Sequence, residues 1–134
     1  MKNNFGNNFP IINLYNSKSI GSKIDTQLLY GDNFKVIKKY NNWKKIKIYK
    51  DGYIGYIKSK KFTKPIIPNF KVSVLKARIF SKPSLNKKLN KFLPYQSRIR
   101  IVSRKGKFAK FEKYWIKISD IKKINLNDKN IFKN

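Results

Sequence analysis

Two stretches decide the fold: Leu28-Leu-Tyr-Gly-Asp-Asn-Phe-Lys-Val-Ile37 and Leu93-Pro-Tyr-Gln-Ser-Arg-Ile-Arg-Ile-Val102. They share the pattern L-x-Y-x-x-x-[FI]-[KR]-[VI]-[IV] at an offset of 65 residues. A chain of 134 residues is long enough for two very small domains, so a repeat of this length indicates two copies of one structural unit.

The offset extends outward from these stretches in both directions. At 65 residues it aligns Leu14-Tyr15 with Ile79-Phe80, and Trp43-Lys-Lys-Ile46 with Phe108-Ala-Lys-Phe111. It then falls to 59, where Gly55-Tyr-Ile-Lys58 meets Tyr114-Trp-Ile-Lys117 and Phe62 meets Ile121. A single deletion of six residues (65 − 59) reconciles the two copies, and most of it falls in a hairpin of the first copy.

Each copy is predicted to consist of short strands. Apolar residues alternate with lysines through Trp43–Ile48, which is typical of a half-buried strand. Asp51-Gly52 predicts a type I′ hairpin, and Lys105-Gly106 predicts a second turn. A single helical turn is possible within residues 85–92. Short strands separated by turns favour small barrels, and thus an all-β protein with two barrels in tandem.

The predicted organisation has five parts. They are a disordered N-terminus (1–9), a first domain (10–64), a linker containing Pro65 and Pro68 (65–70), a second domain (71–124) and a tail (125–134).

The composition excludes most catalytic and metal-binding constellations within the sequence. It contains no Cys and no His, and only six acidic residues, which form no short-spaced carboxylate motif. A Cys or His nucleophile or base, a disulfide and a Cys-ligated zinc are therefore excluded, and we expect no metal, no cofactor and no intrinsic catalysis.

The net charge of +27 has two readings. It can serve nucleic-acid binding through phosphate contacts. It can also follow from A/T-rich codons, because the lysines are spread along the chain and only four of the 33 basic residues are arginines. We favour codon composition. No stretch has the length of a signal peptide or a membrane span, so a cytoplasmic location without membrane contact is expected.

The first copy resembles bacterial SH3 (SH3b) domains through Leu28-Leu-Tyr-Gly-Asp32, Trp43 and Asp51-Gly-Tyr-Ile-Gly-Tyr-Ile57. With the second copy, it is similar to the N-terminal tandem SH3b region of NlpC/P60 dipeptidyl-peptidases, which are cysteine peptidases that cleave peptidoglycan peptides. The resemblance implies two SH3-like barrels in tandem. The Cys/His catalytic domain of that family is not part of this sequence, so the peptidase activity is not carried over.

The resemblance also implies ligand-binding residues. In the family, an acid of the L-x-G-[ED] motif and a tyrosine of the G-Y-x-G motif are associated with holding the free amine of the peptide. These positions correspond to Asp32 and Tyr53, with Tyr56 nearby and Trp43 as a further candidate. Asp32 could instead serve only the turn after Gly31, and Trp43 could belong to the core or the barrel rim.

Two functions follow as hypotheses. The first is a non-catalytic targeting or substrate-recognition module for peptidoglycan peptides, which serves an NlpC/P60 catalytic domain in cis or in trans. The second is a basic SH3-like nucleic-acid-binding protein, whose binding would depend steeply on salt. A third reading, a scaffold that docks onto an enzyme, stays open.

Overall fold

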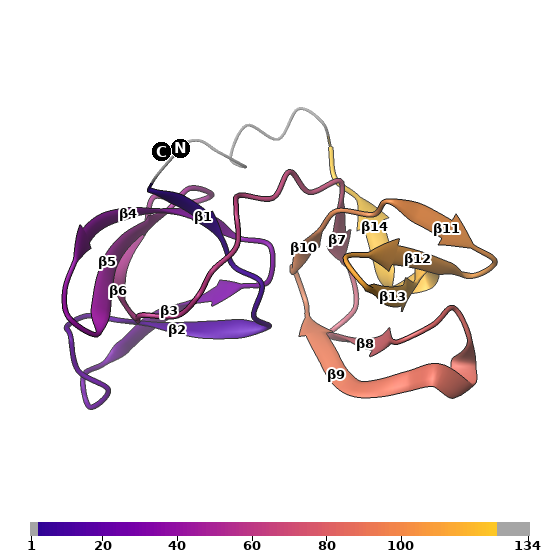
Figure 1. Cartoon of the computed structure of the whole chain (residues 1–134), viewed down its shortest axis with the longest axis horizontal. Coiled ribbons are helices and arrows are strands. Elements are labelled where there is room, and N and C mark those ends of the chain that lie inside the picture. The colour runs from indigo at the N-terminus through magenta and orange to yellow at the C-terminus, as the bar shows by residue number, and fades with distance from the viewer. Residues whose placement is uncertain (1–2, 126–134) are drawn as a thin grey trace. The chain divides into compact units, whose positions relative to one another are not determined.

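The computed structural model describes residues 3–125, and these residues divide into two compact units with the boundary between Ile66 and Ile67. Unit 1 contains strands β1 to β6, and unit 2 contains strands β7 to β14 with two 3-10 turns (Figure 1). The fold is all-β and SH3-like, as predicted. The elements are β1 (Asn4–Gly6), β2 (Ile11–Tyr15), β3 (Ile24–Leu29), β4 (Asn33–Lys39), β5 (Trp43–Ile48), β6 (Ile54–Lys58), β7 (Phe70–Val72), β8 (Lys76–Phe80), η1 (Leu85–Lys87), β9 (Lys88–Pro94), β10 (Arg98–Ile99), β11 (Ser103–Lys105), β12 (Phe108–Phe111), β13 (Tyr114–Lys117), η2 (Ile118–Asp120) and β14 (Ile121–Lys123).

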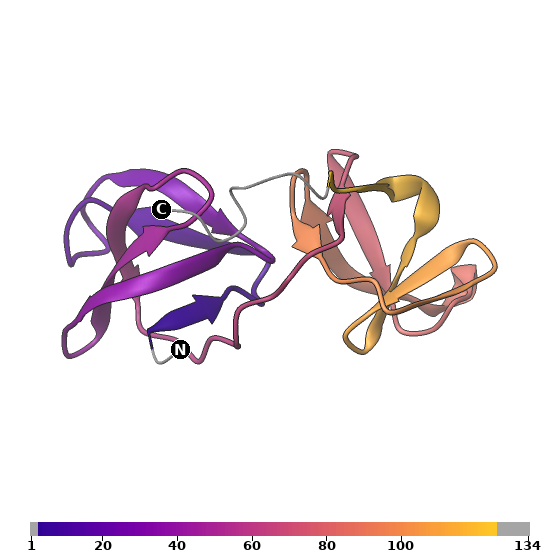
Figure 2. The same ribbon diagram turned by 90° about the horizontal axis from the view of Figure 1, so that it is seen from above.

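Unit 1 is one antiparallel sheet in the order β1-β4-β5-β6-β2-β3, which curls around a common interior (Figure 1 and Figure 2). Its side chains alternate between the interior and the outer face, as the period of a strand requires. The interior is filled by Ile12, Leu14, Leu28, Phe34, Val36, Ile46, Ile48 and Ile57.

Unit 2 has the same strand order. Its five-stranded sheet runs β11-β12-β13-β8-β9, which corresponds to β4-β5-β6-β2-β3, and a three-stranded sheet runs β10-β7-β14. The pair Tyr15↔Tyr56 reappears as Phe80↔Trp115, at offsets of 65 and 59 residues. Ile12↔Leu28 likewise reappears as Ala77↔Leu93.

The buried residues obey the same offsets. Those equivalent to Leu14, Leu28, Phe34 and Ile46 are all nearly inaccessible in unit 2: Ile79, Leu93, Ile99 and Phe111. Ile48 has no counterpart, because the eight residues 47–54 of the first hairpin correspond to Glu112-Lys113 alone. The shorter hairpin in unit 2 turns with Glu112 at a positive φ of 51°.

Two expectations about local structure need correction. Residues 4–6 of the stretch expected to be disordered form β1, since their backbone pairs with β4 and Phe5 packs against the core. The turn at Asp51-Gly52 is not type I′, because only Gly52 has a positive φ and the loop is closed further out, from the Ile48 N–H to the Tyr53 carbonyl. The predicted tail falls almost entirely outside the described residues.

The predicted turn at Lys105-Gly106 is confirmed, with Gly106 at φ +59° between β11 and β12. The helical turn considered for residues 85–92 is present as the single 3-10 turn η1.

Candidate ligand-binding surfaces

Four half-buried rings gather on the outer face of unit 1. Tyr15 on β2 lies directly opposite Tyr56 on β6, and Tyr56 in turn faces Lys45 on β5. Trp43 begins β5, and Tyr40 closes the β4–β5 turn with a hydrogen bond from its N–H to the Trp43 carbonyl. We call this surface the aromatic face; it consists of Tyr15, Tyr40, Trp43 and Tyr56.

The rings of the aromatic face contact one another and are covered by ammonium groups. Tyr15 and Trp43 meet edge to face with centroids 5.5 Å apart, and Tyr40 lies 6.1 Å from Tyr56. Lys18 places its Nζ 3.9 Å from the centroid of Tyr40, which is within cation–π range. Lys38 lies 5.3 Å from the same ring, and Lys45 lies 5.9 Å from that of Tyr56. Such a surface offers both an apolar wall and positive charge to a ligand.

Of the four predicted site residues, Trp43 and Tyr56 share the aromatic face. Tyr53 lies instead at the β5–β6 turn, where its side chain is exposed and its N–H donates to Asp51 Oδ1 at 3.0 Å. Tyr15 and Tyr40, which complete the aromatic face, were not among the predicted site residues. The cross-strand pairing of Tyr15 with Tyr56 is the signal that could have added Tyr15.

Asp32 holds the turn between β3 and β4. Its carboxylate Oδ2 accepts the Leu29 N–H at 2.7 Å and the Lys50 ammonium at 3.0 Å, and the residue is only 2% exposed. Gly31, at φ +84°, and the Asp32 N–H, which donates to the Leu29 carbonyl, complete this turn. The geometry favours the turn role that was weighed for Asp32. The position equivalent to Asp32 in unit 2 is Ser97, which is also buried.

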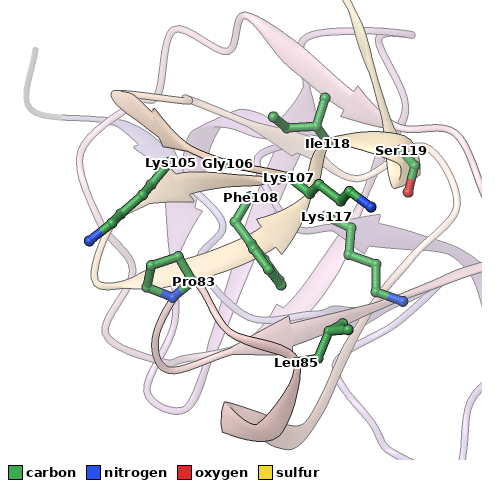
Figure 3. A pocket seen from close by; sticks show the side chains of 9 residues that line it. All are labelled: Pro83, Leu85, Lys105, Gly106, Lys107, Phe108, Lys117, Ile118 and Ser119. Atoms are coloured by element: carbon green, nitrogen blue, oxygen red, sulfur yellow. The ribbon is translucent and has the colours of Figure 1, made fainter.

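Unit 2 carries an open groove of about 780 Å³ beside the β11–β12 turn (Figure 3). Phe108 points toward Leu85, with Pro83 and Lys105 on one side and Lys107 and Lys117 on the other. We call it the unit 2 groove; its lining is Pro83, Leu85, Lys105, Gly106, Lys107, Phe108, Lys117, Ile118 and Ser119. The sequence did not predict it, because it arises from a difference between the two copies and not from a motif.

Three ionisable groups have shifted pKa values. Burial, reinforced by Lys39, lowers the pKa of Lys44 on β5. Burial raises the pKa of Asp120, although the charge of Lys117 opposes this shift. Burial likewise raises the pKa of Glu112 in the β12–β13 turn, against the charge of Lys113.

Residues 3–125 contain no group of three or more acidic, His or Cys residues placed to hold a metal ion. In the same range there is no helix that is long and apolar enough to cross a membrane.

Residues 14–62 match the family of bacterial dipeptidyl-peptidase SH3 domains. Unit 1 is a bacterial SH3 domain of the dipeptidyl-peptidase type. The match covers the strands that carry the aromatic face and the turn that contains Asp32. No curated protein sequence matches the chain.

The fold of the SH3 units is also similar to solved structures. An NlpC/P60 family protein from Bacillus cereus superposes with a TM-score of 0.74 at 15% identity, over 90% of this chain and 56% of that one. NlpC2 from Trichomonas vaginalis gives a TM-score of 0.37 at 14% identity, over 89% of this chain and 46% of that one. The chain thus spans about half the length of these proteins, and the first likeness supports the SH3-like fold.

Proposed function

We propose that this chain is a non-catalytic module that recognises peptidoglycan peptides, and that it binds them on the aromatic face of unit 1. The observation that carries the proposal is that half-buried rings and lysine ammonium groups share one surface of a dipeptidyl-peptidase SH3 domain. Wall peptides combine carboxylates with small apolar side chains, so this surface offers each part a partner.

The role of each predicted site residue follows from its surroundings. Trp43 and Tyr56 supply the apolar wall, and Lys45, whose ammonium lies over the ring of Tyr56, supplies charge for a carboxylate. Asp32 maintains the turn between β3 and β4 and contacts the ligand only if Lys50 is displaced from its carboxylate. Tyr53 lies at the β5–β6 turn, where it is exposed and free to contact a longer peptide.

The proposal assigns the chain a partner of the NlpC/P60 catalytic type, in cis or in trans, to which it delivers the peptide. It rests on the dipeptidyl-peptidase type of the SH3 domain, and co-purification with such a catalytic domain tests it. The cytoplasmic location expected from the sequence stays a prediction, which fractionation tests.

Fluorescence of a single indole tests peptide binding on the aromatic face. The Trp115→Phe variant leaves Trp43 as the only tryptophan, so a muropeptide of the L-Ala-γ-D-Glu type should change its emission in a saturable way. Tyr56→Ala in this background should weaken binding by about tenfold, as loss of an interface aromatic commonly does. Tyr95→Ala is the matched control, because Tyr95 is an exposed tyrosine of unit 2.

A salt series separates this function from nucleic-acid binding. If the charge serves phosphates, a labelled oligonucleotide will bind at physiological salt with a steep salt dependence. We expect weak oligonucleotide binding that disappears near physiological salt. Absence of any muropeptide response, with salt-resistant oligonucleotide binding, would overturn the proposal.

A further inference from the structure

The unit 2 groove occupies the place that the aromatic face occupies in unit 1. Phe80 and Phe108 are equivalent to Tyr15 and Trp43, and their rings also meet edge to face, with centroids 5.1 Å apart against 5.5 Å. Lys110 lies over Trp115 at 5.9 Å, just as Lys45 lies over Tyr56 at 5.9 Å. The two surfaces are therefore copies of one position on the barrel whose side chains differ.

The differences between the copies explain why the groove is open. In unit 1 the β2–β3 loop is held to the β4–β5 turn by Lys18, whose ammonium lies 3.9 Å from the centroid of Tyr40. The equivalent residues in unit 2 are Pro83 and Lys105, which cannot form a cation–π pair. Gly106, with φ +59° and no atom within 4 Å of where a Cβ would be, leaves further space at the turn. Unit 2 thus has a cavity where unit 1 has a contact.

The lining of the groove combines an apolar floor with a positive rim. Phe108, Pro83, Leu85 and Ile118 supply the apolar surface, and Leu85 stays 65% exposed on η1. The Ile118 N–H donates to the Lys107 carbonyl at 2.9 Å, which fixes η2 beside the turn. Three lysines and no acidic residue line the groove. A ligand that fits must carry negative charge around an apolar group.

The placement of the charges favours a peptide as the ligand. Lys105 lies on one side of Phe108, and Lys107 and Lys117 lie on the other (Figure 3). A segment with carboxylates on both sides of one bulky aliphatic side chain can reach all three while that side chain enters the groove. Nucleic acid fits less well, because its bases need flat aromatic faces on which to stack, whereas most of the apolar lining is aliphatic.

We propose that the unit 2 groove is a second binding site, which takes an acidic peptide segment of a partner protein with one aliphatic side chain inserted against Phe108. The site is independent of peptide binding on the aromatic face of unit 1. Each apolar contact displaces water from exposed surface such as that of Leu85, and the lysine rim selects for the flanking carboxylates.

Fluorescence anisotropy with the whole chain and a labelled peptide, Ac-Glu-Glu-Leu-Glu-Glu-NH2, tests this site. Leu85→Ser should weaken binding by about tenfold, the value of one lost aliphatic contact. The double variant Lys107→Glu/Lys117→Glu should weaken it by at least about fivefold, since two exposed charges are reversed. A peptide with Ser in place of Leu, and one with Gln in place of every Glu, should each bind more weakly than the parent.

Matched variants outside the groove are the controls. Leu75→Ser removes an 83% exposed leucine, and Lys122→Glu reverses an exposed lysine on β14; neither residue lines the groove. Both should retain parental affinity, with circular dichroism verifying the fold of every variant. The proposal is overturned if the parent chain does not bind the peptide, if the controls weaken binding as much as the groove variants, or if oligo(dT) binds the groove more tightly than the peptide does.

Discussion

The indole of Trp43 meets the ring of Tyr15 edge to face, with 5.5 Å between the two centroids. This contact joins β5 to β2 across the outer face of unit 1, and β6 lies between the two strands in the sheet. Edge-to-face pairs of this kind add about 0.5–1.5 kcal/mol beyond the area that they bury. The same pair recurs in unit 2 as Phe80 and Phe108, so both barrels are fastened at the same point.

Gly55 should be intolerant of a side chain. A Cβ at this position would lie 2.7 Å from two carbons of Leu14, a fully buried residue, and 3.1 Å from the Tyr15 carbonyl oxygen. Gly55→Ala should therefore lower the free energy of unfolding by about 1–3 kcal/mol through overpacking. Urea denaturation measures the effect, and Gly21→Ala, with 3.7 Å to its nearest neighbour, is the control that should change little. Equal stability of the two variants would contradict the packing described.

Gln96 should be replaceable by glycine with a gain in stability. It has a positive φ of 73° at the position where unit 1 has Gly31 at 84°. Since L-residues in this region are strained, Gln96→Gly should raise the free energy of unfolding by up to about 1 kcal/mol. Gly31→Ala should lower it by a similar amount. A thermal shift in the same direction for both variants would show that the two turns are not equivalent.

Asp32 should matter first for stability. Asp32→Asn removes the charge that accepts the Leu29 N–H and pairs with Lys50, at a residue that is 2% exposed. The loss should be about 2–4 kcal/mol, in the range found for broken charged contacts at buried sites. Asp51→Asn, at an exposed residue that accepts only the Tyr53 N–H in a local turn, should cost less than about 1 kcal/mol. Chemical denaturation that ranks these two variants in the opposite order would rule out the turn role.

Lys44 should make stability depend on pH in the alkaline range. Burial and Lys39 lower the pKa of Lys44, so the unfolded chain holds its proton more tightly than the folded one. Stability from this group is thus missing at neutral pH and is gained as pH rises through the lowered pKa toward the usual value. Lys44→Met should be more stable than the parent at pH 7, and the difference should shrink as pH increases. Lys35→Met, on an exposed residue of β4, should show no such trend in thermal melts.

The offsets in the sequence carried most of the fold. Leu28, Ile46 and Trp43 have counterparts at fixed distances because strand pairs require a fixed register, and the pairs Tyr15↔Tyr56 and Phe80↔Trp115 follow from it. The strand β1 was missed, because its backbone pairing with β4 leaves little trace in side-chain alternation over three residues.

The candidate sites were predicted less completely. Trp43 and Tyr56 do share a surface, because both point outward from neighbouring strands. The position of Asp32 depends on Lys50, which lies 18 residues away and was invisible as a partner before the hairpin was folded. The unit 2 groove depends on the absence of a contact between Pro83 and Lys105, and no pattern in one copy alone reveals it.

Amide chemical-shift mapping of the labelled chain with a muropeptide of the L-Ala-γ-D-Glu type tests the central claim most directly. We predict saturable shifts at Tyr15, Tyr40, Trp43 and Tyr56 and at the lysines beside them, with the groove residues of unit 2 unchanged. Shifts confined to the unit 2 groove, or no saturable shift anywhere in the chain, would contradict the claim that the aromatic face binds wall peptides.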